Sequence, residues 1–277
     1  MNITALVHTF NEERNIKACL QTLKWADEIV VIDMNSDDKT VEICEDYTEN
    51  IYSFNRVGFV EPARKYGIEK CNGEWILIVD ADERIPLSLS NTLRKIVEED
   101  KYDVIEIPNK NHIFGKWIKH TGWYPDYHPR FFKKGFVTPS DKVHGNFKTK
   151  GRKYYLKGLQ NSMYHFGYTG SKDFIDKLNR YTDFEVEKMI KKDKKFTIPK
   201  MMKSGFYEFR RRYFKYKGYK DGIYGLLISL MRGFYHFLIY VKYWEYLNTR
   251  EADYEDKYIE IENKIIKEYS KNEFMKR

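Results

Sequence analysis

Short apolar runs alternate with helical stretches over the first 108 residues, and this alternation limits the possible folds more than any other feature of the chain. Four runs rich in branched residues predict buried strands, at 3–8 (ITALVH), 28–33 (EIVVID), 75–80 (WILIVD) and 103–108 (DVIEIP). The stretches between them predict helices within 11–26, 37–47, 61–73 and 86–100. Such alternation predicts βαβ units and therefore an α/β protein with a mostly parallel sheet flanked by helices.

Polar and acidic residues follow these strands directly. His8-Thr9-Phe10-Asn11-Glu12 follows the first strand, Asp33 ends the second, and Asp80-Ala81-Asp82-Glu83 ends the third. In parallel sheets, ligands bind beyond the carboxyl ends of the strands, where the strand order reverses. Three carboxylates within four residues repel one another unless a positive charge lies among them. We therefore predict a site at this edge that holds a cation; a solvated acidic turn is the alternative.

Two common nucleotide-binding patterns do not occur in the sequence. No GxGxxG follows the first strand, and no GxxxxGK[ST] occurs anywhere. These absences disfavour a dinucleotide-dependent redox enzyme and a P-loop nucleotide hydrolase. A site that meets a nucleotide with carboxylates would need a divalent metal between them and the phosphates.

Several of these motifs together resemble the inverting family 2 glycosyltransferases of the GT-A (Rossmann-like) fold. They are HTFNEE, EIVVID followed by NSDDKT, and ARKYGIEKCNGEWILIVDADE. GKWIKHTGWYPDYHPRFFKKG, VHG and HFGYTGSKDFIDKLNRYT resemble a narrower subgroup that includes lipopolysaccharide-core glucosyltransferases. The resemblance covers about residues 3 to 184. It implies a catalytic domain over 1–170, with a nucleotide-sugar-binding half (1–108) and an acceptor-side half (109–170), and a basic, amphipathic helical extension over 171–277.

The resemblance implies a metal-dependent enzyme that moves a hexose from a nucleotide-sugar, with uridine the expected base, to a cell-surface glycan or lipid-linked acceptor. It assigns donor binding to Thr9, Glu12, Asp33, Asp38, Arg64, Asp80, Ala81 and Asp82. It assigns Mn2+ or Mg2+ binding to Asp82, Asp80 and His165. A carboxylate-held metal would neutralise the charge that develops on the departing diphosphate. Taken singly, Asp33 could instead cap a helix, Arg64 could be a surface charge, and His165 could be structural.

The catalytic base is left open by the sequence. The subgroup usually has Val-His-Glu where this chain has Val143-His144-Gly145, and glycine cannot accept a proton. Inverting sugar transfer needs a base opposite the leaving group. The candidates are Asp126, which is slightly favoured, Asp141 and His144. The aromatic stretch around Asp126 is predicted to contact the acceptor through Trp123, Tyr124 and Arg130, although its rings could instead belong to the core.

A basic segment follows the region of resemblance. Residues 188–220 contain thirteen Lys and Arg and two acids. The net charge of this segment, 13 − 2 = +11, exceeds the net charge of +8 of the whole chain. Residues 222–241 are long and apolar enough to span a membrane, but Arg232 and His236 lie near the middle, and a central Arg costs about 2.5–3.5 kcal/mol. We predict that 188–241 lies at an anionic membrane surface. Docking on the catalytic domain or on a second subunit is the alternative, and nucleic acid is the least favoured partner.

The three cysteines, Cys19, Cys44 and Cys71, are scattered and odd in number, which favours reduced thiols in the cytoplasm. The first residues do not show a signal-peptide pattern. The predicted location is therefore cytoplasmic, at the inner face of the cell membrane. Two other functions stay open: the same transfer to a polypeptide side chain, or a non-catalytic nucleotide-sugar- or glycan-binding protein that lacks the usual base.

Overall fold

The computed structural model describes residues 1–55, 60–139, 147–249 and 254–270. The chain forms two compact units. The first comprises Met1–Phe174 and Arg211–Ile228, and the second comprises Ile175–Arg210 and Ser229–Arg277. Residues 211–228 therefore belong to the first unit, whereas the sequence-based division at residue 170 places them in the extension.

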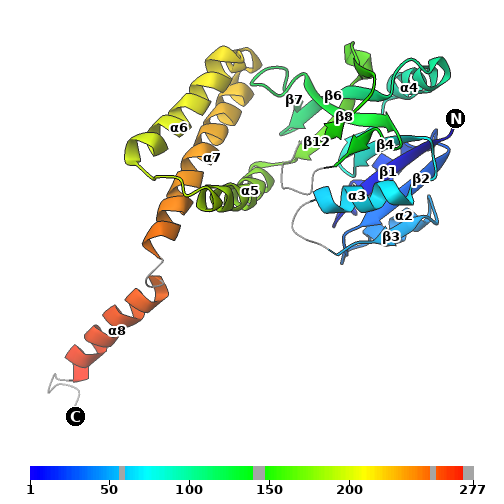
Figure 1. Ribbon diagram of the computed structural model, residues 1–277. Coiled ribbons are helices and arrows are strands. Elements are labelled where there is room, and N and C mark those ends of the chain that lie inside the picture. The colour runs from blue at the N-terminus through cyan, green and yellow to red at the C-terminus, as the bar shows by residue number, and fades with distance from the viewer. Residues whose placement is uncertain (56–59, 140–146, 250–253, 271–277) are drawn as a thin grey trace. The chain divides into compact units, whose positions relative to one another are not determined.

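One large sheet forms the centre of the first unit (Figure 1). Its strands are β1 (Ile3–Thr9), β2 (Glu28–Asp33), β3 (Ile51–Ser53), β4 (Trp75–Asp80), β5 (Glu83–Arg84), β6 (Val104–Ile113), β7 (Lys116–Trp117), β8 (Asp126–Lys133), β11 (Lys153–Tyr155) and β12 (Met163–Tyr168). The order is β3-β2-β1-β4-β8-β6-β12-β5, with β7 and β11 also pairing with β6. Strands β9 (Val137–Thr138) and β10 (Lys148–Thr149) form a separate small ladder.

The first half of the sheet is parallel and the second half is mixed. Strands β3, β2, β1 and β4 pair in parallel, as the alternation of strands and helices predicts. Strand β8 then inserts antiparallel between β4 and β6. A parallel return needs a crossover that is usually helical, and only the short β7 and loop residues separate β6 from β8. The predicted α/β class with flanking helices and a C-terminal helical extension is confirmed.

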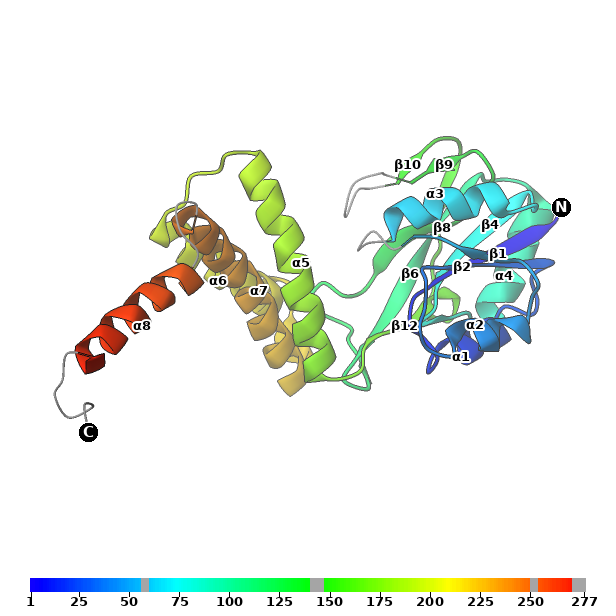
Figure 2. The ribbon, with the colours of Figure 1, turned by 90° about the horizontal axis from the view of Figure 1, so that it is seen from below.

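Helices cover both faces of the parallel half (Figure 2). They are α1 (Ile16–Gln21), α2 (Thr40–Glu45), α3 (Glu61–Lys70) and α4 (Leu87–Glu99). Alternate strand residues point to opposite faces, so Ala5 packs with α1, α2 and α4, whereas Leu6 packs on the side of α3. Trp75 of β4 and Phe131 of β8 stack on one face of the sheet, with their ring centroids 4.6 Å apart.

The strand order reverses at β1. Strand β2 pairs on one side of β1, and β4, which comes later in the chain, pairs on the other side. Such a switch point opens a crevice at the carboxyl ends of the strands. Here His8 aligns with Asp80 across β1 and β4, and Thr9 aligns with Asp33 across β1 and β2. The fold therefore brings the polar strand ends to one edge, where the sequence places the site.

Residues 211–221 hold the loop that precedes β8. They form a short π-helix, η2 (Arg211–Lys215), and a 3-10 turn, η3 (Gly218–Asp221). The buried Asp221 carboxylate accepts the His120 backbone N–H at 2.8 Å and lies 3.0 Å from Nδ1 of the same residue. Arg212 Nη1 donates to the Thr121 carbonyl at 2.6 Å. A Cβ at Gly122, whose φ is +79°, would lie 2.8 Å from the Tyr216 ring, so the fit requires glycine.

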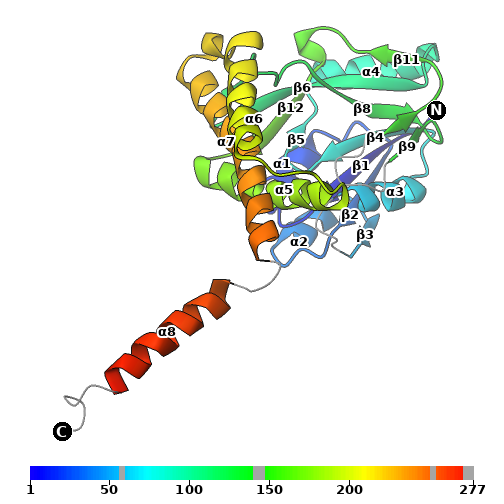
Figure 3. The same cartoon turned by 60° about the vertical axis from the view of Figure 1, so that its left-hand side comes forward.

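The second unit consists mainly of helices α5 (Ser171–Lys191), α6 (Ile198–Arg210), α7 (Ile223–Asn248) and α8 (Tyr254–Ser270), of which α5 and α7 begin in the first unit. Helices α6 and α7 run antiparallel, side by side (Figure 3). Lys242 of α7 pairs with Asp183 of α5, and the Tyr243 hydroxyl donates to the Lys194 carbonyl. By length and mean hydropathy (1.3), α7 is the single helix in the described part of the chain that could cross a membrane.

Candidate active site

Asp80 ends β4 inside a cluster of buried opposite charges. Its carboxylate lies 2.9 Å from Arg130 Nη2 and 3.3 Å from Arg64 Nη2. Arg130 Nη2 also lies 2.8 Å from Glu83 Oε1, and Glu83 Oε2 accepts the Asp80 backbone N–H at 2.8 Å. Burial alone would raise the pKa of Asp80, but Arg130 and Arg64 hold that pKa well below its usual range. Two guanidinium groups thus provide much of the positive charge that adjacent carboxylates require.

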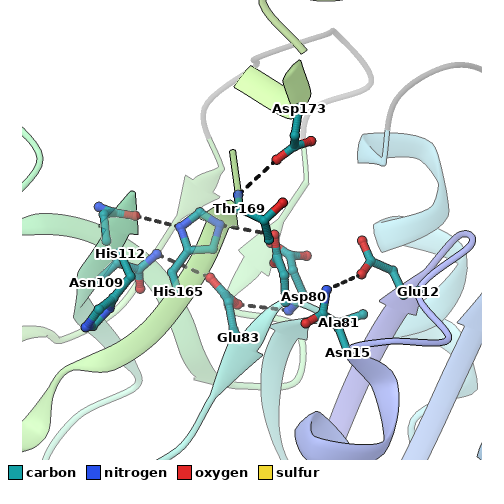
Figure 4. Close-up of polar contacts among 12 residues, drawn as sticks. Glu12, Asn15, Asp80, Ala81, Glu83, Asn109, His112, His165, Thr169 and Asp173 are labelled. Carbon is teal, nitrogen blue, oxygen red and sulfur yellow. Dashed lines mark hydrogen bonds and ion pairs between the residues drawn. The ribbon is translucent and has the colours of Figure 1, made fainter. Parts of the chain in front are cut away.

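His165, which Figure 4 shows beside Glu83 and Asp80, forms a second polar group with Asp82 at the same edge. His165 Nε2 of β12 lies 3.4 Å from Asp82 Oδ2 in the turn after β4. On the other side of the ring, Nδ1 lies 2.6 Å from Asn111 Oδ1. Because an amide oxygen only accepts hydrogen bonds, His165 carries a proton on Nδ1 and directs Nε2 at Asp82. Burial lowers the pKa of His165, but Asp82 outweighs it and raises this pKa to about 9.

The donor set of this pair suits a divalent cation that also binds phosphate. Mg2+ is usually held by one or two carboxylates together with substrate phosphates, and Mn2+ also accepts imidazole. Asp82 supplies the carboxylate, and Asn111 fixes the His165 ring as a second-sphere partner fixes a metal-bound histidine. No group of three or more His, Cys, Asp or Glu that could hold a metal occurs within the described ranges. Asp80, the third predicted ligand, is instead held by arginine.

Asn111 joins this pair to Asp126, the favoured base candidate. Its amide Nδ2 donates to Asp126 Oδ2 at 3.2 Å and to the Trp123 carbonyl at 2.8 Å. His128 Nε2 lies 3.3 Å from the other carboxylate oxygen of Asp126. Burial opposes the shift, yet His128 and Asn111 lower the pKa of Asp126, so it is a carboxylate at neutral pH. A continuous polar row thus runs from Asp82 through His165 and Asn111 to Asp126. The other base candidates, Asp141 and His144, lie outside the described residues.

The predicted donor residues of the first two strands lie together at the switch point. Thr9 is buried, and its hydroxyl has no hydrogen-bond partner within the described part of the protein. Asp33 accepts the Ser36 backbone N–H at 3.0 Å and the Ser36 hydroxyl at 2.5 Å. A buried hydroxyl without a partner costs free energy unless a ligand completes it, so Thr9 is the donor residue whose surroundings best fit a bound group.

Two other predicted donor residues join the loops after β1 and β2. The Glu12 backbone N–H donates to Thr40 Oγ1 at 2.8 Å, and its side chain accepts from Asn15 Nδ2 at 2.7 Å. Asp38 accepts the backbone N–H groups of Thr40 (2.9 Å) and Glu13 (3.1 Å). These hydrogen bonds hold the two loops against each other at the edge of the site.

The remaining donor predictions lie on α3 and in the β4–β5 turn. Arg64 approaches Asp80, and its guanidinium lies over the Phe147 ring, 5.4 Å from the centroid. Its Nε is buried and has no partner among the residues that the structure describes. Ala81 is buried, and its carbonyl accepts from Arg84 Nη1 at 2.9 Å. The fold therefore brings Arg64 to the carboxylates from a helix that lies before them in the sequence.

The three predicted acceptor residues differ in their surroundings. Arg130 is buried between Asp80 and Glu83, so it positions carboxylates and does not present its charge to an acceptor. Trp123 packs edge-on against Tyr168, with the Arg212 guanidinium 5.8 Å from its ring centroid. Tyr124 packs edge-on against Trp117 and precedes a cis proline. Trp123 and Tyr124 are half-buried close to Asp126 in the sequence.

Sequence reasoning missed several polar residues of the site. Asn109 and Asn111 lie on β6, which the sequence pattern ends at Pro108 but which continues to Ile113. Asn109 Nδ2 donates to Glu83 Oε1 at 3.2 Å. The signal was present, because two asparagines at a spacing of two place both side chains on one face of a continued strand. His128 also belongs to the site, but no local pattern distinguishes it from a surface residue. Glu83 was recognised as part of the acidic run, but its partner Arg130 was not.

Residues 4–155, more than half of the chain, match Glycosyl transferase family 2. An uncharacterized glycosyltransferase from Rickettsia typhi is 25% identical over 272 residues, covering 93% of this chain and 92% of that protein. The lipopolysaccharide core biosynthesis glycosyltransferase LpsC from Rhizobium meliloti is 23% identical over 252 residues, covering 88% of this chain and 92% of LpsC. Among solved structures, S. aureus TarS 1–349 in complex with UDP gives a TM-score of 0.48 at 17% identity, with 80% of this chain and 75% of that chain covered. A longer TarS structure gives a TM-score of 0.47 at 17% identity, with 80% of this chain and 46% of that chain covered.

Proposed function

This chain belongs to glycosyl transferase family 2, and from that premise we propose that it transfers a hexose from a UDP-linked donor to a cell-surface glycan or lipid-linked acceptor with inversion at the sugar. The observation that carries the proposal is the polar row from Asp82 through His165 and Asn111 to Asp126. Its two ends supply the two functions that inverting transfer needs, a site for the departing diphosphate and a base for the incoming hydroxyl.

The donor binds at the switch point in this proposal. Thr9 and Asp33 meet the nucleobase, Arg64 contacts the base or diphosphate, and Asp80 contacts the ribose, held in place by Arg130. Asp82 and His165 would hold Mn2+ or Mg2+, which when bound would neutralise the charge that develops on the diphosphate. His165 must give up its Nε2 proton to act as a ligand. Asn111 keeps the ring oriented through Nδ1 in either protonation state.

Asp126 is the proposed base for the acceptor hydroxyl. The acceptor oxygen forms a bond to the anomeric carbon while the bond from that carbon to the diphosphate oxygen breaks. The hydroxyl proton passes to Asp126, whose carboxylate Asn111 and His128 orient. A lowered pKa keeps Asp126 unprotonated at neutral pH, and general base catalysis of this kind contributes about 10²- to 10⁴-fold to the rate.

The acceptor and the location are also part of the proposal. The LpsC relative, named for lipopolysaccharide core biosynthesis, supports a glycan or glycolipid acceptor. The three cysteines are buried free thiols, which supports a reducing, cytoplasmic location. Burial raises the pKa of Cys44 and of Cys71 to about 12, so neither is an ionised nucleophile at neutral pH.

Calorimetry with UDP tests the donor side. We expect UDP to bind more tightly with Mn2+ than with a chelator, and we expect Asp82→Asn to abolish that difference. The matched control is Glu99→Gln, which changes an exposed carboxylate on α4 that lies 3.1 Å from exposed Lys101. Equal UDP affinity with and without Mn2+ in the unchanged protein would refute the metal proposal.

Turnover tests the base. With UDP-glucose, UDP-galactose or UDP-N-acetylglucosamine and a cell-envelope glycolipid extract, we expect Asp126→Asn to lower kcat at least about 100-fold while UDP binding is retained. A loss below threefold would remove Asp126 as the base. Donor binding without any turnover would support the non-catalytic alternative, and sugar transfer to added protein would support a polypeptide acceptor.

A further inference from the structure

The α6–α7 pair of the second unit exposes a set of large apolar side chains on its surface. Each is between 50% and 64% exposed, and we call the set the apolar face: Ile198, Met202, Phe206, Leu230 and Phe234. Isolated exposed apolar residues are ordinary, but a contiguous set marks an interaction surface. The question is whether the members from the two helices lie on one side of the pair.

Two glycines fix the orientation of the helices. The carbonyl of Gly233 would lie 3.0 Å from a Cβ at Gly205, and the carbonyl of Gly205 would lie 3.0 Å from a Cβ at Gly233, so both glycines are at the contact. Gly205 also approaches Phe237, and Gly233 approaches Phe209, which makes the pair antiparallel. A Cβ at either position would require the facing backbone to move by a few tenths of an ångström.

Each helix carries its apolar residues at the same offsets from its contact glycine. Met202 and Phe206 are three residues before and one after Gly205, and Leu230 and Phe234 are at the same offsets from Gly233. At about 100° per residue, three residues back is a rotation of about −300°, which is the same direction as +60°, and one residue forward is a rotation of about +100° from the contact. In an antiparallel pair, the same rotation from the contact leads to the same side of both helices. The apolar face is therefore one continuous surface.

The charges around the apolar face are of one sign. In the second unit, residues 194–210 and 229–244 contain seven Lys and Arg and a single acid, Glu208. Glu208 is buried, and it lies 3.9 Å from His236 between the two helices. Lys203 and Arg210 are exposed and lie about 160° and 140° round α6 from the contact, next to Phe206 at about 100°, along the outer border of the apolar face.

We propose that the apolar face inserts into the headgroup region of a bilayer that contains anionic lipid, with the lysines and arginines along its border meeting the lipid phosphates. Apolar side chains bordered by lysine and arginine are the pattern of interfacial membrane helices. This proposal does not depend on the transfer chemistry. It names the surface responsible for the membrane partner that the sequence predicts for 188–241.

Other occupants fit the surface less well. A second copy would place like charges opposite one another, since a two-fold interface pairs a patch with itself. Nucleic acid would match the charge but not five exposed apolar side chains, of which only two are aromatic. A membrane-spanning α7 would have to take its partners into the bilayer, because Gly233 packs on α6 and Lys242 pairs with α5.

Vesicle co-sedimentation tests the proposal with the full chain. We expect binding to phosphatidylcholine vesicles that contain 30% phosphatidylglycerol, and at least about tenfold weaker binding to phosphatidylcholine alone. The double variant Phe206→Ser/Phe234→Ser should bind the anionic vesicles at least about tenfold more weakly. The control is Tyr207→Ser, because Tyr207 is 61% exposed but lies on the far side of α6, about 200° from the contact.

Charge reversal tests the border of the face. We expect Lys203→Glu/Arg210→Glu to weaken binding to anionic vesicles at least about tenfold, and Lys17→Glu, an exposed lysine of the first unit, to leave it within twofold. Circular dichroism and UDP binding show that each variant is folded, which separates loss of membrane binding from loss of the donor site.

Four outcomes would overturn the proposal. The first is no binding to either vesicle, and the second is unchanged binding of the double Phe variant. The third is a dimer in solution that the double Phe variant converts to monomer, which would assign the face to a second copy. The fourth is resistance to extraction by alkaline carbonate, which would indicate a spanning α7 instead of an interfacial face.

Discussion

The edge of the sheet at β4 and the α6–α7 pair differ in how their charged side chains are placed. At the edge of the sheet, Glu83 and Arg130 are buried and Asp80 is half-buried, and each is within 3 Å of an oppositely charged partner. On α6, lysines lie exposed beside apolar side chains, and the single acid of that helix is buried. Burial makes pairing obligatory in the first region, whereas solvent screens the charges of the second.

The difference teaches which charges hold the fold and which are available to a partner. Removing one member of a buried pair leaves its partner uncompensated in a medium of low dielectric constant. Removing an exposed lysine leaves nothing uncompensated. The three substitutions that follow test this contrast, beginning with the largest expected effect.

Replacement of Arg130 by Met should cause the largest loss of stability. It leaves the Asp80 and Glu83 carboxylates close together without the guanidinium between them, and we expect the free energy of unfolding to fall by about 3–5 kcal/mol. Urea unfolding of the whole chain measures this free energy. Lys101→Met, which removes an exposed partner of Glu99, serves as the control and should change stability by less than about 1 kcal/mol. A similar loss of stability in Arg130→Met and Lys101→Met would contradict the distinction between buried and exposed charges.

Replacement of Asp103, the residue before β6, should have an intermediate and pH-dependent effect on stability. Hydrogen bonds from Arg152 and Lys133 to its carboxylate hold the pKa of Asp103 well below its usual range. A carboxyl group with a lowered pKa stabilises the fold above its unfolded value, and this contribution is lost as the pH falls toward the folded value. We expect Asp103→Asn to cost about 2 kcal/mol at pH 7 and progressively less below about pH 4.

Unfolding of Asp103→Asn at pH 7, 5 and 3.5 measures that dependence. Asp46, a residue after α2 that is exposed to solvent, provides the matched Asp→Asn control and should show no comparable change with pH. A deficit for Asp103→Asn that stays constant from pH 7 to pH 3.5 would contradict the assigned ion pairs.

Lys200→Gln/Lys203→Gln should have the smallest effect on stability. Both lysines are exposed, and we expect the free energy of unfolding to change by less than about 0.5 kcal/mol in either direction. Thermal unfolding monitored by circular dichroism checks this. A large destabilisation would mean that these lysines hold the helices together.

Much of the fold could be predicted from local patterns. The strands of the parallel half lie where the apolar runs predict them, and the α/β class with a GT-A fold is confirmed. The second half could not be predicted in the same way, because β8 is antiparallel and inserts between β4 and β6. Which strands pair over long sequence separations depends on the whole sheet and has no local sequence signal.

The site shows the same division. Asp80, Asp82 and Asp33 follow strands, so a parallel sheet must bring them to one edge whatever its detailed order. Arg130 was assigned to the acceptor because it follows an aromatic loop, but the pairing of β8 with β4 places it against Asp80, fifty residues away. Asn111, which joins His165 to Asp126, was missed because β6 runs five residues beyond the end that its sequence pattern predicts.

The sequence by itself determined the family, the strands that carry the acidic edge, and the excess of positive charge after residue 188, because composition, periodicity and motif order are properties of contiguous residues. The tertiary structure alone decided which arginine neutralises which carboxylate, that residues 211–221 return to hold the loop before β8, and that two helices show their apolar residues on one side. Those features depend on sheet order and on the contact between two glycines. Both are set by packing between segments far apart in the chain, and no local pattern encodes them.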